Sequence, residues 1–289
     1  MSDVLVLRNP RSGRLLGRVR EPLPGRQLLL TDELDLDLEA CIEAQALVIE
    51  GGDGTVQRVL TTLLRLVEPW QLPPIALMPA GTTNVTAANV NHTKSYEKAR
   101  DALEIALGSN VPEITERSIL RAQFANEVHF GFLFGLGIVS ESVEQFIAKR
   151  SSSPLVSAWR MSAIFARSLV TTRSMARVET EAGVVDTFAM MATTLDRVLY
   201  GMRPYLPGDL PGRMHTIWIA AGAGGLWRRL PRLARGAASL FEEKGFASRD
   251  VTSLAIRFDG SYTLDGELYH SPGSPLVLSL SPPLRFLVL

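Results

Sequence analysis

Apolar residues in the first third of the chain alternate between strand-like runs and helix-like spacings. Short apolar runs predict buried strands at residues 4–7, 46–50 and 75–79. Apolar residues three or four positions apart predict helices at residues 55–67, from about Asn84 onwards, and at residues 94–107. This alternation is typical of an α/β fold, in which helices cross over between the strands of a parallel sheet.

The pattern changes after Pro112, where short strand-like segments are separated by turn residues. Hairpins are predicted for residues 119–124 with 128–132, for 175–180 with 184–191, and for 252–258 with 262–264 around Asp259-Gly260. Helical insertions are predicted at residues 139–149, 154–171 and 226–243. The second part of the chain is therefore expected to be an antiparallel, β-rich domain with helical insertions.

A chain of 289 residues is long for one compact core and comfortable for two. Because the pattern changes near residues 112–118, we expect an N-terminal α/β domain over residues 1–116 and a β-rich domain over residues 117–283. Residues 284–289 are apolar enough to form a further strand, which could return to the first sheet.

The composition limits the partners that the chain can attract. Its 30 Lys and Arg residues balance its 30 Asp and Glu residues, so no overall field draws it to nucleic acid, and we expect no nucleic-acid partner. The single cysteine, Cys41, excludes an internal disulfide, is most simply a core residue, and fits a reducing cytosol. Because neither a signal peptide nor an apolar run long enough for a bilayer is present, we expect a soluble, cytoplasmic protein.

A glycine-rich turn, Gly51-Gly52-Asp53-Gly54-Thr55, follows the second predicted strand and precedes a predicted helix, which Thr55 is expected to cap. Backbone N–H groups and the positive end of a helix can hold phosphate at such a turn. Asp53 would repel the phosphates unless a divalent cation, or a proton that it must accept, lies between them. The turn indicates nucleotide binding and phosphoryl transfer, although a plain tight connection remains an alternative.

Three further segments lie at turns of the predicted scaffold. They are Asn9-Pro10-Arg11-Ser12-Gly13 after the first strand, Pro79-Ala80-Gly81-Thr82-Thr83-Asn84 after the third, and Leu264-Asp265-Gly266-Glu267 between late strands. Asp265-Gly266 is also typical of an ordinary hairpin turn between residues 262–264 and 268–270. In this order, the four segments resemble the diacylglycerol kinase catalytic-domain family, which includes bacterial lipid kinases and sphingosine kinases. The resemblance covers essentially the whole chain.

This resemblance implies an ATP-dependent lipid kinase that phosphorylates a hydroxyl of diacylglycerol or a related lipid, held in a cleft between two domains. The nucleotide-binding residues would be Asn9, Ser12, Gly51, Gly52, Asp53, Gly54, Thr55, Gly81, Thr82, Thr83 and Asn84. The catalytic residues would be Asp53, Asp265 and Glu267. Glu267 or Asp265 would accept the proton of the lipid hydroxyl, while Mg²⁺, which Asp53 could contact, offsets the charge of the phosphates.

Several positions depart from the usual pattern of the family. Gln57 and Arg58 replace an Asn-Glu pair, and Val85 replaces an Asp that usually follows the Gly-Thr-x-Asn turn. Gly212-Arg213, with Asp209 upstream, stands where the family often has an acidic residue at a structural metal. These departures leave open a nucleotide- or lipid-binding protein with altered catalysis. NAD kinase, which shares the Gly-Gly-Asp-Gly turn, is a further alternative.

The segment 226–241 places apolar residues on one helical face and four arginines, Arg228, Arg229, Arg232 and Arg235, largely elsewhere. One interpretation is an interfacial helix that contacts anionic lipid at the inner membrane surface. The favoured one is a helix packed on the core with a solvated basic face, in which Pro231 marks a kink or a start. Segment 154–171, with Trp159 and Arg160, raises the same question.

The histidines offer no separate clue to function. The four of them, His92, His129, His215 and His270, lack the spacing of metal ligands, and we expect them to be structural. The acceptor lipid and the oligomeric state are not specified by the sequence, because lipid pockets are lined by generic apolar side chains.

Overall fold

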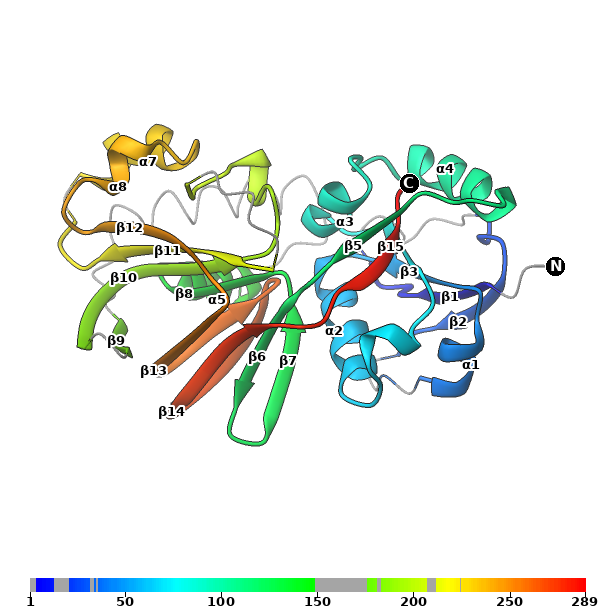
Figure 1. Ribbon diagram of the computed structural model, residues 1–289, viewed down its shortest axis with the longest axis horizontal. Coiled ribbons are helices and arrows are strands. Elements are labelled where there is room, and N and C mark those ends of the chain that lie inside the picture. The colour runs from blue at the N-terminus through cyan, green and yellow to red at the C-terminus, as the bar shows by residue number, and fades with distance from the viewer. Residues whose placement is uncertain are drawn as a thin grey trace. The chain divides into compact units, whose positions relative to one another are not determined.

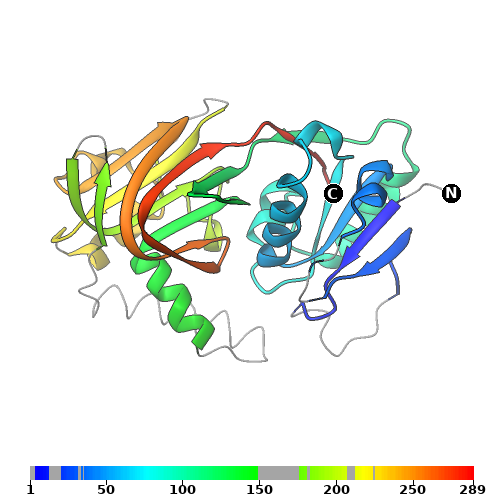
Figure 2. The same cartoon turned by 90° about the horizontal axis from the view of Figure 1, so that it is seen from below.

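The computed structural model describes residues 4–12, 21–31, 34, 36–148, 176–180, 183–206, 212–223 and 225–289. These residues form two compact units (Figure 1, Figure 2). The first unit contains the described residues up to Ile119 together with Ser281–Leu289, and the second contains the described residues from Leu120 to Leu280. Each unit has its own sheet and its own buried core.

The first unit is built on a six-stranded sheet in the order β2-β1-β3-β4-β15-β5. Its strands are β1 (Val4–Arg8), β2 (Arg26–Leu29), β3 (Ala46–Gly51), β4 (Ile75–Pro79), β5 (Ile114–Arg117) and β15 (Leu284–Leu287). Every neighbouring pair is parallel except β5 with β15, which is antiparallel. The parallel sheet predicted from the alternating apolar pattern is confirmed, and the last strand of the chain lies between β4 and β5.

Helices connect the strands of this sheet. They are α1 (Leu38–Glu43), α2 (Asp53–Leu64), α3 (Val85–Val90) and α4 (Tyr96–Gly108), with a 3-10 helix at Pro69–Gln71. The buried apolar residues of α2 lie three or four positions apart and share one face, namely Val56, Val59, Leu60, Leu63 and Leu64. α4 packs Ala99 and Leu103 against Val6 and Val48 of the sheet. The helices predicted here are therefore confirmed, with shifts of one to three residues at their ends.

The second unit is built on a nine-stranded sheet in the order β12-β11-β10-β8-β13-β14-β6-β7, with β9 pairing with β10 and β13. Its strands are β6 (Leu120–Phe124), β7 (Glu127–Gly131), β8 (Leu133–Gly137), β9 (Ala176–Thr180), β10 (Gly183–Thr193), β11 (Met214–Ala220), β12 (Phe246–Val251), β13 (Ser253–Leu264) and β14 (Glu267–Leu280). All of its pairs are antiparallel. The predicted β-rich domain is confirmed.

Two of the three predicted hairpins form, β6 with β7 and β9 with β10. The third prediction is wrong, because residues 253–264 make the single strand β13 rather than two strands around Asp259-Gly260. The register of β13 against β14 shifts between Arg257 and Asp259, and the chain reverses later at Asp265-Gly266. An Asp-Gly pair suits either feature, because both need a residue that tolerates unusual backbone angles.

Helices cover parts of the second sheet. They are α5 (Ile138–Ala148), α7 (Leu226–Leu233) and α8 (Ala238–Phe241), with a 3-10 helix at Leu199–Gly201. The single helix predicted over residues 226–243 is divided, because Gly236 between α7 and α8 has a φ of 62° and lies against the backbone of Tyr205. The insertion predicted at 154–171 lies outside the described residues. Of the helices described, none is long and apolar enough to cross a membrane.

Candidate functional site

The turns after β3 and β4 touch each other at the carboxyl ends of these parallel strands. A Cβ atom on Gly81 would lie 2.4 Å from the Cα of Gly52, and one on Gly52 would lie 3.0 Å from the Cα of Gly81. The N–H of Ala80 donates a hydrogen bond to the carbonyl of Gly51 at 2.9 Å. The contact between the two turns therefore requires glycine at both positions, even without a ligand.

Helix α2 begins at this contact with its N-terminus uncapped by any side chain. Gly52 is its N-cap residue and Asp53 its first residue, so the prediction that Thr55 caps the helix is wrong. Thr55 lies in the first turn of α2, where its hydroxyl accepts a hydrogen bond from Asn9 Nδ2 at 2.8 Å. The first N–H groups of a helix have no partners within it, and the helix dipole adds positive charge there. The start of α2 can therefore hold an anion.

Asp53 points toward the neighbouring helix rather than toward this free end. Its carboxylate accepts hydrogen bonds from the hydroxyl of Thr83 at 2.7 Å and from the N–H groups of Val85 and Thr86 at 3.1 and 2.9 Å. It therefore caps α3 across 30 or more residues of sequence, and the amides of α3 balance its charge. The charge of Asp53 thus has partners without a cation or an added proton, and a catalytic role for Asp53 stays a prediction.

Of the residues predicted in the third turn, Asn84 is buried and Thr82 is exposed. Asn84 is 1% exposed, and its side chain bonds to the N–H and carbonyl of Gly81 and to the carbonyl of Pro79 at 2.8, 3.0 and 3.3 Å. Its amide therefore holds the turn in shape. Thr82 is exposed and makes no hydrogen bond to any described residue, so its hydroxyl is available to a ligand.

The turn after β1 is tied to the other two through Asn9. The side chain of Asn9 accepts a hydrogen bond from the N–H of Arg11 at 3.0 Å while it donates to Thr55. The N–H of Asn9 donates to the carbonyl of Glu50, and the N–H of buried Ser12 donates to the carbonyl of Asn9. Asn9 thus lies beside the first turn of α2 and Ser12 is bonded to Asn9, whereas Gly13 lies outside the described residues.

A buried ionic cluster lies just before the glycine turn and was missed by the sequence reasoning. The carboxylate of Glu50 is 0% exposed and pairs with Arg8, whose Nε and Nη2 lie 2.5 and 3.3 Å from its two oxygens. The hydroxyl of Tyr96 donates to the same carboxylate. A charged residue inside the apolar run of β3, opposite Arg8 at the end of β1, is the signal that could have revealed it.

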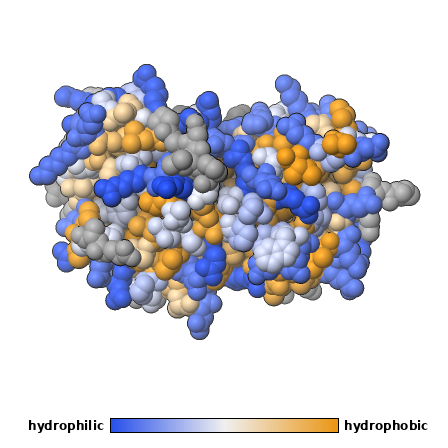
Figure 3. All heavy atoms as spheres, in the orientation of Figure 1, coloured by the Kyte–Doolittle hydropathy of each residue, from blue (hydrophilic) through white to orange (hydrophobic). Residues whose placement is uncertain are grey.

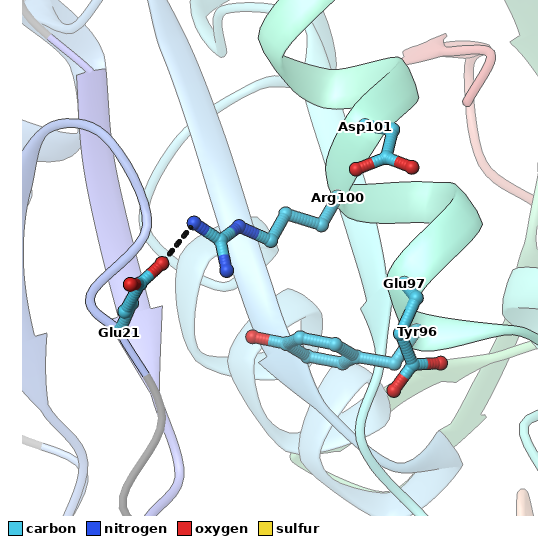
Figure 4. Close-up of a pocket in the computed structure, with 5 residues that line it drawn as sticks. All are labelled: Glu21, Tyr96, Glu97, Arg100 and Asp101. Carbon is cyan, nitrogen blue, oxygen red and sulfur yellow. Dashed lines mark hydrogen bonds and ion pairs between the residues drawn. The ribbon is translucent and has the colours of Figure 1, made fainter.

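A pocket of about 350 Å³ lies beside this cluster and shares Tyr96 with it (Figure 4). Its other lining residues are Glu21, Glu97, Arg100 and Asp101. Arg100 reaches from α4 to Glu21 at 2.7 Å, and this bond raises the pKa of the guanidinium above its usual range. None of the predicted site residues lines this pocket, and an ion pair spans it, so we do not assign it to the nucleotide.

In the second unit, Asp265 and Glu267 flank the turn between β13 and β14. Asp265 has a φ of 51°, and its carboxylate accepts hydrogen bonds from the N–H groups of Phe132 and Leu133 at 2.9 and 2.8 Å. Asp265 therefore anchors this hairpin to the connection between β7 and β8. Glu267 is partly exposed and makes no hydrogen bond or ion pair with any described residue. Of these two carboxylates, Glu267 is the one available to a substrate.

Two of the positions that depart from the family pattern, Gln57 and Val85, are buried in the first unit. Gln57 is 0% exposed and donates to the hydroxyl of Thr61 at 3.2 Å. Val85 buries its side chain and keeps its N–H for Asp53. The side chains at these two positions therefore face the interior of the first unit.

A metal site is not formed by the residues that the structure describes, among which no group of three His, Cys, Asp or Glu side chains could hold an ion. Asp209 lies outside the described residues. At the start of β11, His215 Nδ1 lies 2.7 Å from Asp250 Oδ1, and the His215 ring stacks on Tyr205 with centroids 4.0 Å apart.

Residues 3–114 match the family model of the diacylglycerol kinase catalytic domain. A Salmonella arizonae protein named "Probable lipid kinase YegS" is 30% identical over 105 residues, which are 36% of this chain and 33% of that relative. The match thus spans about a third of the relative's length.

Solved structures from Bacillus anthracis strain Sterne share the fold of the whole chain. A candidate diacylglycerol kinase has a TM-score of 0.72 at 17% identity, over 100% of this chain and 97% of its own. A diacylglycerol kinase has a TM-score of 0.66 at 16% identity, with the same coverage. Residues 3–114 are thus similar to the diacylglycerol kinase catalytic-domain family, while the solved structures share the fold of the whole chain.

Proposed function

We propose that the protein is a lipid kinase that transfers the γ-phosphoryl group of ATP to a hydroxyl of diacylglycerol or a related lipid. One observation carries the proposal: the uncapped start of α2, joined by Asn9 to the turn after β1 and by Gly52 to the turn after β4. In a chain whose first part is similar to the diacylglycerol kinase catalytic domain, such a place suits the phosphates of a nucleotide.

The two neighbouring helix starts differ in what they can bind. The carboxylate of Asp53 already occupies the start of α3, so a phosphate there would meet a negative charge. The start of α2 keeps its first N–H groups free, and the exposed hydroxyl of Thr82 follows the adjoining turn. The phosphates would therefore bind at α2, with Asp53 as a positioning residue that keeps α3 from competing.

Proton acceptance is assigned to Glu267. As the lipid oxygen bonds to the γ-phosphorus and ADP leaves, the hydroxyl proton would pass to the carboxylate of Glu267, which has no other partner among the described residues. Asp265 would hold the hairpin that presents it. Mg²⁺ would offset the charge of the nucleotide phosphates. Because the described residues form no metal site, we assign no step to that ion.

The test incubates the purified protein with radiolabelled ATP, magnesium and diacylglycerol in nonionic micelles. Glu267→Gln is expected to lower kcat by a factor of about 100 or more with little change in nucleotide affinity. Glu127→Gln is the matched control, because Glu127 also begins the second strand of a hairpin and its side chain is 63% exposed. Turnover that survives in Glu267→Gln would remove Glu267 from the mechanism.

A nucleotide-binding protein with altered catalysis is the second candidate function. Two observations favour it. The carboxylate of Asp53 already accepts hydrogen bonds from α3. The described residues also contain no group of three His, Cys, Asp or Glu side chains that could hold a metal ion. Binding of ATP without any labelled lipid would support it. Label on NAD, added to the same reaction, would instead favour the NAD kinase alternative.

A further inference from the structure

The charged pair Arg8–Glu50 lies at the end of β1 and one residue before the end of β3. Arg8 and Glu50 are opposite each other at the last register position that joins these two parallel strands. The residues that follow them, Asn9 and Gly51, lead directly into two of the turns of the candidate site. Whatever fixes this pair therefore also fixes the starting points of both turns.

The pair is buried and its contact is directional. Figure 3 shows hydrophilic side chains over much of one face of the molecule, where charged groups usually lie, whereas the Glu50 side chain is 0% exposed. Arg8 places Nε and Nη2 at 2.5 and 3.3 Å from the two carboxylate oxygens, which is a two-point contact. The hydroxyl of Tyr96, on a ring that extends from the start of α4, donates to the same carboxylate (Figure 4). We call Arg8, Glu50 and Tyr96 the buried triad.

Two hydrogen bonds lead from the buried triad to the start of α2. The backbone N–H of Asn9 donates to the carbonyl of Glu50 at 3.0 Å. The side-chain amide of Asn9 donates to the hydroxyl of Thr55, in the first turn of α2, at 2.8 Å. A single residue, Asn9, thus connects the buried triad to the uncapped helix start at which the phosphates would bind.

Stability alone does not account for a charged pair at this position. Taking two charges out of water costs free energy, and well-packed apolar side chains of similar volume often stabilise a fold equally well or better. Apolar contacts are non-directional, however, whereas a forked contact between arginine and carboxylate fixes the angle between its partners. The property that apolar residues could not reproduce here is the orientation of the two strand ends.

We propose that the buried triad positions the nucleotide site: it holds the turn after β1 against the start of α2 and so sets the affinity of the first unit for ATP. Its members are positioning residues, because they act through Asn9 and are not assigned to touch the nucleotide. Donors that a rigid supporting layer already holds in place lose little affinity to their own ordering. The inference deepens the proposed function and rests on it for the identity of the ligand.

An apolar replacement of the whole triad separates positioning from stability. The triple variant Arg8→Met, Glu50→Leu, Tyr96→Phe leaves no unpaired buried charge, so the central amides of β1 and β3 should keep their hydrogen-exchange protection. Its dissociation constant for ATP with magnesium, measured by calorimetry, should nevertheless rise about tenfold, the factor that one lost hydrogen bond is worth. In the kinase assay the KM for ATP should rise by the same factor, while the KM for the lipid stays unchanged.

The matched control lowers stability without changing a residue of the triad. Leu103→Ala empties a position that is 0% exposed on α4, the helix that carries Tyr96, so it should destabilise the first unit. At a temperature where this variant is folded, its affinity for ATP should equal that of the wild type. The single variant Tyr96→Phe removes one hydrogen bond from the triad and should weaken ATP binding about threefold, which keeps the test valid if the triple variant does not fold.

Two results would overturn the proposal. Wild-type affinity for ATP in a folded triple variant would make the triad purely structural, and so would an equal loss of affinity in Leu103→Ala. If the triple variant does not fold, wild-type affinity in Tyr96→Phe would overturn it in the same way.

Hydrogen exchange without nucleotide separates this inference from the proposed function. The N–H of Asn9 should exchange faster in the triple variant than in the wild type, because its acceptor is no longer held in place. If the wild type binds no ATP, the proposed function fails. Faster exchange at Asn9 would then still support the positioning of the turn, whereas unchanged protection would overturn it.

Discussion

Removing the carboxylate of Glu50 should strongly destabilise the first unit, because it leaves two buried partners without an acceptor. Arg8, whose side chain is 17% exposed, would lose its counter-ion, and Tyr96, which is 3% exposed, would lose the acceptor of its hydroxyl. Breaking a buried ion pair from one side costs about 3–5 kcal/mol. An orphaned buried hydroxyl adds about 1–3 kcal/mol, and the two costs overlap because the groups share one site.

For Glu50→Ala we therefore expect a loss of about 4 kcal/mol in the free energy of opening β1 and β3. Tyr96→Phe should cost about 2 kcal/mol, since it removes one hydrogen bond to a charged group and keeps the pair with Arg8. Native-state hydrogen exchange of the amides of β1 and β3 is the suitable measurement. A chain of two compact units need not unfold in a single two-state step, so a global melting curve would mix them.

A double-mutant cycle gives the control and the refutation. Arg8→Ala combined with Glu50→Ala should cost clearly less than the sum of the two single changes, because no unpaired buried charge remains. Arg26→Ala, which breaks the exposed pair with Asp37, should cost less than about 1 kcal/mol. A loss below 1 kcal/mol for Glu50→Ala, or additive effects of Glu50 and Arg8, would show that the buried cluster does not hold these strands together.

Three further outcomes are expected. Gly81→Ala places a Cβ 2.4 Å from the Cα of Gly52, so it should cost about 1–3 kcal/mol and weaken ATP binding in calorimetry. Burial raises the pKa of Cys41 from 9.0 to about 11, so its thiol should resist Ellman's reagent at pH 8 until the protein unfolds. The folded state holds that proton more tightly, so the stability contributed by Cys41 is present below pH 9 and is lost as the pH rises toward 11. Asp265→Ala should lower the hydrogen-exchange protection of β8 and β13 in the second unit, since it removes the acceptor of the Phe132 and Leu133 N–H groups, whereas Glu267→Gln should leave it unchanged.

Each of these outcomes has a control that could contradict it. Gly108→Ala adds a Cβ with nothing within 4 Å, so equal losses from Gly108→Ala and Gly81→Ala would refute the role of the turn contact. Rapid labelling of Cys41 in the folded protein would contradict its burial. A loss of protection in Glu267→Gln as large as that in Asp265→Ala would show that Glu267 is structural.

The sequence by itself determined the two kinds of sheet and the turns that matter. Apolar periodicity distinguishes helix from strand within a few residues, and glycine marks the places where strands end, so β1, β3, β4 and their turns followed from local patterns. The same local reasoning misplaced one hairpin. Asp259-Gly260 and Asp265-Gly266 are equally good turn signals, and only the pairing of β13 with β14 along its length decided between them.

The tertiary structure alone decided what the polar side chains of the candidate site do. Asp53 looks like a carboxylate among phosphate-binding amides, yet it caps α3, and Asp265 bonds to backbone 132 and 133 residues away. Gly52 has to be a glycine because the backbone of Gly81 packs against it, independently of any ligand. The partners of Glu50 are Arg8 on β1 and Tyr96 on α4. Such bonds depend on which distant backbone groups the packed elements bring within about 3 Å, and no short-range pattern encodes that distance.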